Sequence, residues 1–289
     1  MTITASLVKE LRERTGAGMM DCKKALQDAN GDIDVAIEEM RKSGAAKAAK
    51  KAGRVAAEGV IKIQQDGQDV IIVEINCETD FVAKDENFME FADKVIKALQ
   101  ENSPEDVDAL MAVKVDGQSL EESLQQLIAK IGEKVTVRRF QKHTLPNTIG
   151  AYQHGTRIGV IVDLHGGDAD MARDIAMHIA ASKPVCVSED QVPQELLDQE
   201  KEIFSAQAAE SGKPAEIIEK MVTGRMNKFL KEITLLGQPF VKDPDQTVAK
   251  LLNAANAEVT SFIRYEVGEG IEKKADNFAE EVMAQAKGE

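Results

Sequence analysis

An acidic and an aromatic side chain stand next to each other at Asp80 and Phe81, between Thr79 and Val82. The apolar run 70–75 precedes them and an amphipathic stretch follows from residue 86, so they are predicted to lie in a loop between a strand and a helix. Loops on rigid scaffolds commonly carry function. We therefore predict that this loop reaches into a partner. The alternative is that Asp80 caps the helix and Phe81 folds into the core.

Residues 165–178 contain a second group of side chains with possible chemistry, since two histidines and three aspartates are close in sequence: His165, Asp168, Asp170, Asp174 and His178. A metal site is one interpretation. However, Asp170 and Asp174 are predicted to lie in the first turn of a helix, where carboxylates stabilise the helix dipole, and His178 has apolar neighbours. We therefore predict no metal site.

His154 occupies the predicted tip of a hairpin. No Ser, Cys or carboxylate nearby in the sequence could make it a general base, so we expect either a binding residue or an ordinary turn residue. The chain also lacks a phosphate-binding Gly-x-x-x-x-Gly-Lys-Ser/Thr loop, a Gly-x-Gly-x-x-Gly segment after a strand, and His-Glu-x-x-His. We expect no catalytic residues, no cofactor and no covalent chemistry.

Composition narrows the class of protein. The 289 residues are 43% hydrophobic and 30% charged, which predicts a globular protein of about two domains. No apolar run approaches the ~20 residues of a membrane span, and a signal-peptide pattern is missing, so we predict a cytoplasmic protein without membrane association. Cys22, Cys77 and Cys186 include no Cys-x-x-Cys pair, so we expect reduced, mostly buried thiols.

The charge is unevenly distributed. A net charge of -14 argues against a nucleic-acid partner. Residues 1–54 nevertheless contain eleven Lys and Arg against eight Asp and Glu, so the remainder carries -17. A weakly basic N-terminal segment followed by an acidic remainder favours a protein partner with its own charge pattern. For Lys47, Lys50, Lys51 and Arg54, a solvated helical surface is the alternative.

The N-terminal segment 3–42 is predicted to form three short helices. Residues 14–18 interrupt the helical spacing, and the sequence Asn-Gly-Asp at 30–32 ends the second helix and caps the third. The Ala/Lys-rich stretch 45–52 is typical of a helical linker. A unit of this size favours docking over catalysis, because it has little room for an active-site cavity.

A weak internal repeat organises the central segment. Each copy has a strand, a polar turn, a second strand, a loop and a helix, and the copies begin near residues 59 and 150. The Gly-containing turns at 65–68 and 153–156 are hairpin signals. Additional strands at 135–140 and 259–267 complete two sheets. We therefore predict two related α+β subdomains.

Residues 193–233 show the pattern of two helices separated at 211–214, which predicts an antiparallel helical hairpin. Its apolar seam is closed internally or by a second copy of the chain. Internal packing is favoured, because an exposed seam with Met221 and Phe229 would reduce solubility. A terminal helix from residue 269 has too few apolar anchors to be stable alone and is expected to dock.

Several motifs resemble those of one family. The stretch 7–26, followed by 30–32, is similar to the N-terminal signature of translation elongation factor Ts, and residues 79–83 match its second signature. Residues 152–155 and 267–271 also resemble that family. The resemblance covers nearly the whole chain and is weakest at 101–125 and at the C-terminal end.

The resemblance implies an α+β fold with five parts. They are an N-terminal ubiquitin-associated-like domain of three helices that docks the partner (1–54), core subdomain N (55–142), core subdomain C (143–187 and 235–267), an inserted antiparallel helical hairpin for dimerisation (188–234) and a C-terminal helical module (268–289).

The resemblance also implies a guanine-nucleotide exchange factor for elongation factor Tu. Thr79, Asp80, Phe81 and Val82 would disturb the partner's Mg²⁺ site, so that GDP leaves and GTP rebinds. Phe81 would wedge between partner helices. Further partner contacts are implied at Arg12, Met19, Met20, His154 and Gly155, and a 2:2 assembly through the hairpin is one arrangement.

Two other function classes remain open at this point. A cytoplasmic adapter or chaperone-like module would hold another protein through the N-terminal helices without affecting a nucleotide. A metal-dependent hydrolase would need the residues between His165 and His178 to bind a metal ion.

Overall fold

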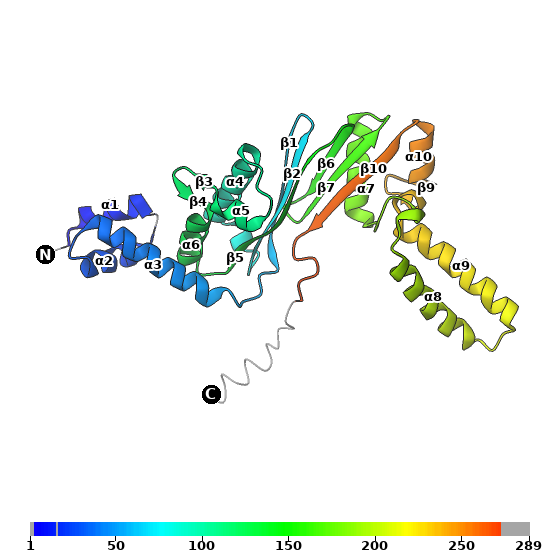
Figure 1. The fold of residues 1–289 in the computed structure, drawn as a ribbon, viewed down its shortest axis with the longest axis horizontal. Coiled ribbons are helices and arrows are strands. Elements are labelled where there is room, and N and C mark those ends of the chain that lie inside the picture. Colours follow the sequence, from blue (N-terminus) through cyan, green and yellow to red (C-terminus); the bar gives the residue numbers. More distant parts are fainter. Residues whose placement is uncertain (1–2, 16, 273–289) are drawn as a thin grey trace. The chain divides into compact units, whose positions relative to one another are not determined.

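The computed structural model describes residues 3–15 and 17–272 and divides the chain into two compact units (Figure 1). The first unit holds residues up to Val60, Glu74–Arg139 and the chain from Val267 onward; the second holds Ile61–Val73 and Phe140–Glu266. Helices alternate with small sheets in both, which confirms the α+β prediction. The subdomain boundaries drawn from the sequence stay predictions.

The first unit begins with three helices, α1 (Ala5–Thr15), α2 (Met19–Asp28) and α3 (Ile33–Lys51). Their small core includes Leu11 and Leu26, which are fully buried. Asp32 caps α3 as predicted, because its carboxylate accepts the backbone N–H groups of Asp34 and Val35. The Ala/Lys-rich stretch is helical, and it forms the second half of α3 without a break.

The remaining elements of the first unit include a three-stranded sheet with the order β1-β2-β5. Some residues of these strands belong to the second unit. These elements are β1 (Glu58–Asp66), β2 (Asp69–Cys77), a 3-10 turn η1 (Val82–Lys84), α4 (Glu86–Glu101), α5 (Val107–Ala112), β3 (Lys114–Val115), β4 (Gln118–Ser119), α6 (Leu120–Ile131) and β5 (Val135–Thr144). Ser119 and Glu122 form a capping box that starts α6, and Gly132 ends it with φ 87°.

The second unit contains an antiparallel sheet with the order β10-β7-β6, covered by α7 (Figure 1). The elements are β6 (Thr148–His154), β7 (Ile158–His165), α7 (Ala169–Ser182) and β10 (Glu258–Glu266). Alternate β7 residues Val160, Val162 and Leu164 enter the core with Ile175. Gly150 permits α7 to approach, since a Cβ there would lie 2.2 Å from the Ala172 carbonyl oxygen.

The two sheets share one strand order. In each sheet, two strands form a hairpin, and a third strand pairs with the second strand of that hairpin. The third strand is β5, which pairs with β2, in one sheet and β10, which pairs with β7, in the other. The helices α4 and α7 follow the second strands. The repeat predicted from the sequence is therefore present in the topology.

A helical hairpin follows α7 in the chain. Its helices α8 (Gln194–Ala209) and α9 (Ala215–Ile233) lie side by side and antiparallel (Figure 1). The Phe204 and Phe229 rings meet edge to face, with their centroids 6.2 Å apart. Of their side chains, only Ala208 and Val222 are buried. The seam is thus closed in part internally, and self-association stays a prediction.

Short elements flank the hairpin and lead to β10. They are η2 (Glu189–Gln191), η3 (Leu235–Gly237), β8 (Pro239–Phe240), β9 (Asp243–Thr247) and α10 (Val248–Ala254). Residues 269–272, where the sequence predicts the start of the terminal helix, are not helical, and the rest of that prediction, from residue 273 onward, lies outside the described residues. Within the part of the chain that is described, no helix has the length and apolar character needed to cross a membrane.

Candidate functional site

The loop between β2 and α4 presents an aromatic ring to solvent. Phe81 is 81% exposed, more than any other large apolar side chain in residues 3–15 and 17–272, whereas its neighbours Val82 and Ala83 are buried. Asp80 is also exposed and forms an ion pair with Lys84 at 3.0 Å. The chain therefore places a phenyl ring and a carboxylate together on an otherwise anchored loop.

The alternative in which this loop only starts a helix is wrong. Asp85, not Asp80, caps α4, because its carboxylate accepts the backbone N–H groups of Asn87 at 2.9 Å and Phe88 at 3.4 Å. The Asn87 side chain adds a further bond, and these bonds hold the pKa of Asp85 below its usual value. Phe81 does not enter the core. Asp80 and Phe81 are thus exposed to contacts outside the chain, although Asp80 also pairs with the exposed Lys84.

The base of the loop is fixed by residues distant in sequence. The Glu133 carboxylate accepts both the Thr79 backbone N–H and the Thr79 hydroxyl. The Cys77 thiol donates to the Thr79 carbonyl oxygen at 3.2 Å, and burial raises the pKa of this thiol to about 12. Cys77 is therefore an uncharged structural group. Glu133 could not be predicted from the sequence, since no local pattern links it to Thr79.

Arg12, Met19 and Met20 lie on the N-terminal helices. Met19 and Met20, in the first turn of α2, are 61% and 75% exposed, and Arg12 in the last turn of α1 is exposed as well. Adjacent exposed methionines are flexible apolar contacts that suit a protein partner. The three side chains can therefore contribute to a docking surface.

His154 and Gly155 lie in the second unit, at the turn between β6 and β7. Both are exposed, and Gly155 has φ 58°, a conformation that favours glycine. The Tyr152 hydroxyl lies 3.2 Å from Nδ1 of His154, which orients the imidazole. Neither a Ser or Cys side chain nor a carboxylate takes part in this hydrogen-bonded pair, so its exposed groups can serve as hydrogen-bonding contacts.

Four of the five candidate metal ligands, His165, Asp168, Asp174 and His178, take part in other interactions. Nδ1 of buried His178 accepts the Val241 backbone N–H, so its Nε2 carries the hydrogen that Gln238 accepts at 3.0 Å. Burial lowers the pKa of His178, partly offset by the Gln238 bond, and favours the neutral ring. Asp168 caps α7, and Asp174 pairs with Lys242.

Asp170 lies in the first turn of α7 as predicted, whereas Asp174 lies beyond it. Among the described residues, no group of His, Cys, Asp and Glu side chains could hold a metal ion. The metal-dependent hydrolase interpretation therefore has no site in residues 3–15 and 17–272.

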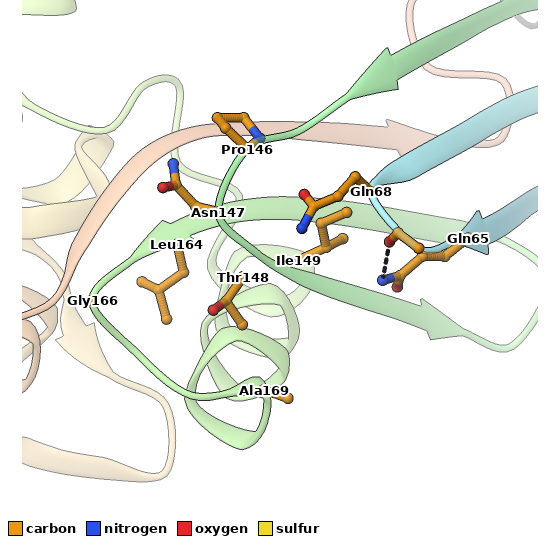
Figure 2. A pocket seen from close by; sticks show the side chains of 10 residues that line it. Gln65, Gln68, Pro146, Asn147, Thr148, Ile149, Leu164, Gly166 and Ala169 are labelled. Carbon is orange, nitrogen blue, oxygen red and sulfur yellow. Dashed lines mark hydrogen bonds between the residues drawn. The ribbon is translucent and has the colours of Figure 1, made fainter.

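A shallow hollow of about 460 Å³ lies in the second unit (Figure 2). Amide and hydroxyl side chains contribute to its lining, and the Gln65 amide turns back to the Gly67 carbonyl oxygen at 3.3 Å. Its lining residues are Gln65, Gly67, Gln68, Pro146, Asn147, Thr148, Ile149, Leu164, Gly166 and Ala169. None of the predicted site residues lines it.

Comparison with known proteins gives a consistent result. The sequence model of the family described as Elongation factor TS matches residues 78–269. The chain is 68% identical over 292 residues to Elongation factor Ts of Thioalkalivibrio sulfidiphilus (strain HL-EbGR7), with 100% of both chains covered. It is 61% identical over 291 residues to Elongation factor Ts of Alkalilimnicola ehrlichii (strain ATCC BAA-1101 / DSM 17681 / MLHE-1), again over 100% of both chains. Elongation factor Ts of Idiomarina loihiensis (strain ATCC BAA-735 / DSM 15497 / L2-TR) is 59% identical over 285 residues, which cover 99% of this chain and 98% of that relative.

Proposed function

The chain belongs to the elongation factor Ts family, the nucleotide exchange factors of elongation factor Tu in translation, and we propose that its Thr79–Val82 loop promotes GDP release by disturbing the Mg²⁺ site of that GTPase. The observation that carries the proposal is the 81% exposed Phe81 beside Asp80, on a loop anchored at its base. An exposed ring in an anchored loop is suited to entering a gap between elements of a partner.

The chemistry of magnesium gives the mechanism its logic. Mg²⁺ demands near-ideal octahedral geometry and links bound GDP to the GTPase, so a small displacement of its surroundings weakens nucleotide binding. Phe81 wedges between partner helices, and Asp80 perturbs the polar contacts near the ion. Coupling between two ligands is reciprocal, so a factor that weakens GDP binding is itself weakened by nucleotide. Rebinding of GTP then releases the factor.

The other surfaces dock the partner. Arg12, Met19 and Met20 supply a basic and apolar contact on the N-terminal helices, and His154 with Gly155 supplies a second contact at the β6–β7 turn. Their exposure supports this assignment. The factor needs no phosphate loop of its own, because the nucleotide stays in the GTPase. We propose that it acts without covalent chemistry.

His154→Ala is expected to weaken binding to elongation factor Tu with GDP about fivefold, since a partly oriented imidazole at a contact surface contributes about 1 kcal/mol. Isothermal titration calorimetry measures this change. His143→Ala is the matched control, because His143 is an exposed histidine of the same unit that is not assigned to the partner surface. Equal affinities for wild type and His154→Ala return His154 to an ordinary turn residue.

Replacing residues 193–233 by a short Gly/Ser linker is expected to leave GDP release within about twofold of wild type and to abolish any self-association. The hairpin buries few side chains of its own, and the backbone bond from Leu235 N–H to the Cys186 carbonyl oxygen remains to close the junction. Light scattering after size exclusion reports the mass, and stopped-flow fluorescence reports GDP release. Loss of release by a folded variant gives the hairpin a direct role in exchange.

A further inference from the structure

Glu133 lies 54 residues after Thr79 in the chain and holds it by two hydrogen bonds. Oε2 accepts the Thr79 backbone N–H at 3.0 Å, and Oε1 accepts the Thr79 hydroxyl at 2.8 Å. Hydrogen bonds to an ionised acceptor are roughly twice as strong as neutral ones. One carboxylate therefore fixes both the backbone and the side chain of the residue that precedes Asp80.

A further hydrogen bond joins Glu78 and Lys134, the neighbours of Thr79 and Glu133, with the acceptor now on the other segment. Oε1 of Glu78 accepts the Lys134 backbone N–H at 2.6 Å. Residues 78 and 79 are thus joined reciprocally to residues 133 and 134, and we name these four residues the clasp. Arg54 pairs with Glu78 at 3.3 Å, and the Lys134 ammonium donates to the Arg54 carbonyl oxygen at 2.9 Å. The clasp is therefore tied to the segment that follows α3.

Thr79 carries this constraint forward along the loop. Its hydroxyl gives its hydrogen to Glu133, so its lone pairs remain for the Val82 backbone N–H at 3.4 Å. Its carbonyl oxygen accepts the Ala83 N–H at 3.3 Å. Both ends of the Asp80–Phe81 pair are consequently held by Thr79, which is held by Glu133.

Phe81 needs this support because its ring, being exposed, has little packing to orient it. Its direction depends on the backbone of residues 79–82. A loop already held in its bound conformation loses less conformational entropy on binding and keeps a wedge in its productive position. We propose that Glu133 is a positioning residue for nucleotide exchange: it holds Asp80 and Phe81 in the conformation that enters the GTPase. This inference rests on the proposed function of the loop.

Glu133→Ala tests the proposal in the full-length chain with elongation factor Tu and a fluorescent GDP analogue. We expect the release rate at saturating factor to fall about tenfold, while the half-saturating concentration stays within about twofold, because the docking surfaces are untouched. Glu133→Gln keeps a carbonyl acceptor and should recover part of the rate. Glu121→Ala removes the same charge from an exposed position in the first turn of α6, where Glu121 accepts a hydrogen bond from Gln125, and should match wild type.

Two further measurements distinguish the loss of loop positioning from a general loss of stability. In a Phe81→Ala background, Glu133→Ala should lower the rate by less than about threefold more, since the ring whose position it controls is already absent and only the position of Asp80 remains to be lost. In the free protein, the amides of Val82 and Ala83 should exchange hydrogen about tenfold faster in Glu133→Ala than in Glu121→Ala. If a urea titration shows that Glu133→Ala is largely unfolded without urea, Thr79→Val is used instead. It replaces the Thr79 hydroxyl by a methyl group and tests the same hydrogen bonds.

The proposal is overturned if the Val82 and Ala83 amides of Glu133→Ala exchange hydrogen at the wild-type rate. It is also overturned if Glu133→Ala slows GDP release by the full tenfold in the Phe81→Ala background. These outcomes are distinct from failure of the proposed function. If wild type does not accelerate GDP release at all, the function fails, whereas the exchange of the two amides still decides whether Glu133 orders the loop.

Discussion

Phe81→Ala is expected to slow GDP release from elongation factor Tu about 30-fold at saturating factor, because truncation of a central aromatic contact costs about 2 kcal/mol. The ring is exposed in the free chain, so its removal withdraws little apolar area from the core. The free energy of unfolding should change by less than about 0.5 kcal/mol. Stopped-flow release of a fluorescent GDP analogue gives the rate, and a urea titration gives the stability.

The control for this prediction is a similar truncation at a distant exposed residue. Ile217→Ala removes an exposed apolar side chain from α9 and should leave release unchanged. Asp80→Ala should act in the same direction as Phe81→Ala, since we propose that the carboxylate perturbs the polar contacts of the magnesium region. An unaltered release rate for folded Phe81→Ala removes the ring from the mechanism.

The second large effect concerns Glu74, a fully buried carboxylate in β2. It accepts hydrogen bonds from Arg138 at 3.0 Å, Arg139 at 2.6 Å and the Gly268 backbone N–H at 2.8 Å. Arg138 also donates to the Glu269 carbonyl oxygen. Gly268 has φ 74°, and a Cβ there would lie 2.3 Å from a backbone oxygen, so this close approach needs glycine. Glu74 thus fixes the chain immediately before the C-terminal segment.

Glu74→Ala is expected to lower the free energy of unfolding by about 3 kcal/mol, because it removes the buried carboxylate that accepts hydrogen bonds from two half-buried arginines and from the Gly268 backbone N–H. Glu74→Gln keeps the shape and two polar groups and should cost less. Urea unfolding at pH 7 measures both. Glu121→Gln, an exposed change of the same chemistry, should stay within about 0.5 kcal/mol of wild type.

The pH dependence of this effect has a definite sign. Burial alone would raise the pKa of Glu74, but the hydrogen bonds from Gly268, Asn76 and the two arginines together hold it below the ordinary value of 4.5. A depressed pKa contributes stability above the unfolded-state value, and this contribution is lost as the pH falls through the folded-state value. The difference between wild type and Glu74→Gln should therefore be constant near neutrality and shrink below about pH 4.5. A difference that stays constant into the acid range contradicts the assignment.

Features governed by neighbouring residues could be predicted from the sequence. The Asn-Gly-Asp turn defines the end of α2 and the cap of α3, and the Gly-containing turns define both hairpins. The matching order of the two sheets follows from the repeat. The loop of Asp80 and Phe81 was found by its position between a strand and a helix, but two aspartates five residues apart could each cap α4, and sequence alone did not choose Asp85.

The contacts that hold the loop could not be predicted in this way. Glu133 reaches Thr79 across 54 residues, and Glu74 reaches Gly268 across 194. Such pairs depend on how the strands and helices pack, and no spacing in the sequence records them. Likewise, His178 among apolar residues was compatible with several roles until the structure showed both ring nitrogens hydrogen-bonded within the core.

The most direct test of the proposed exchange activity is the release of a fluorescent GDP analogue from elongation factor Tu, followed by stopped flow with magnesium present, with and without this protein. We expect acceleration by orders of magnitude, with loss of most of that acceleration in Phe81→Ala. Binding to elongation factor Tu without any acceleration contradicts the proposed activity and favours an adapter that holds its partner through the N-terminal helices.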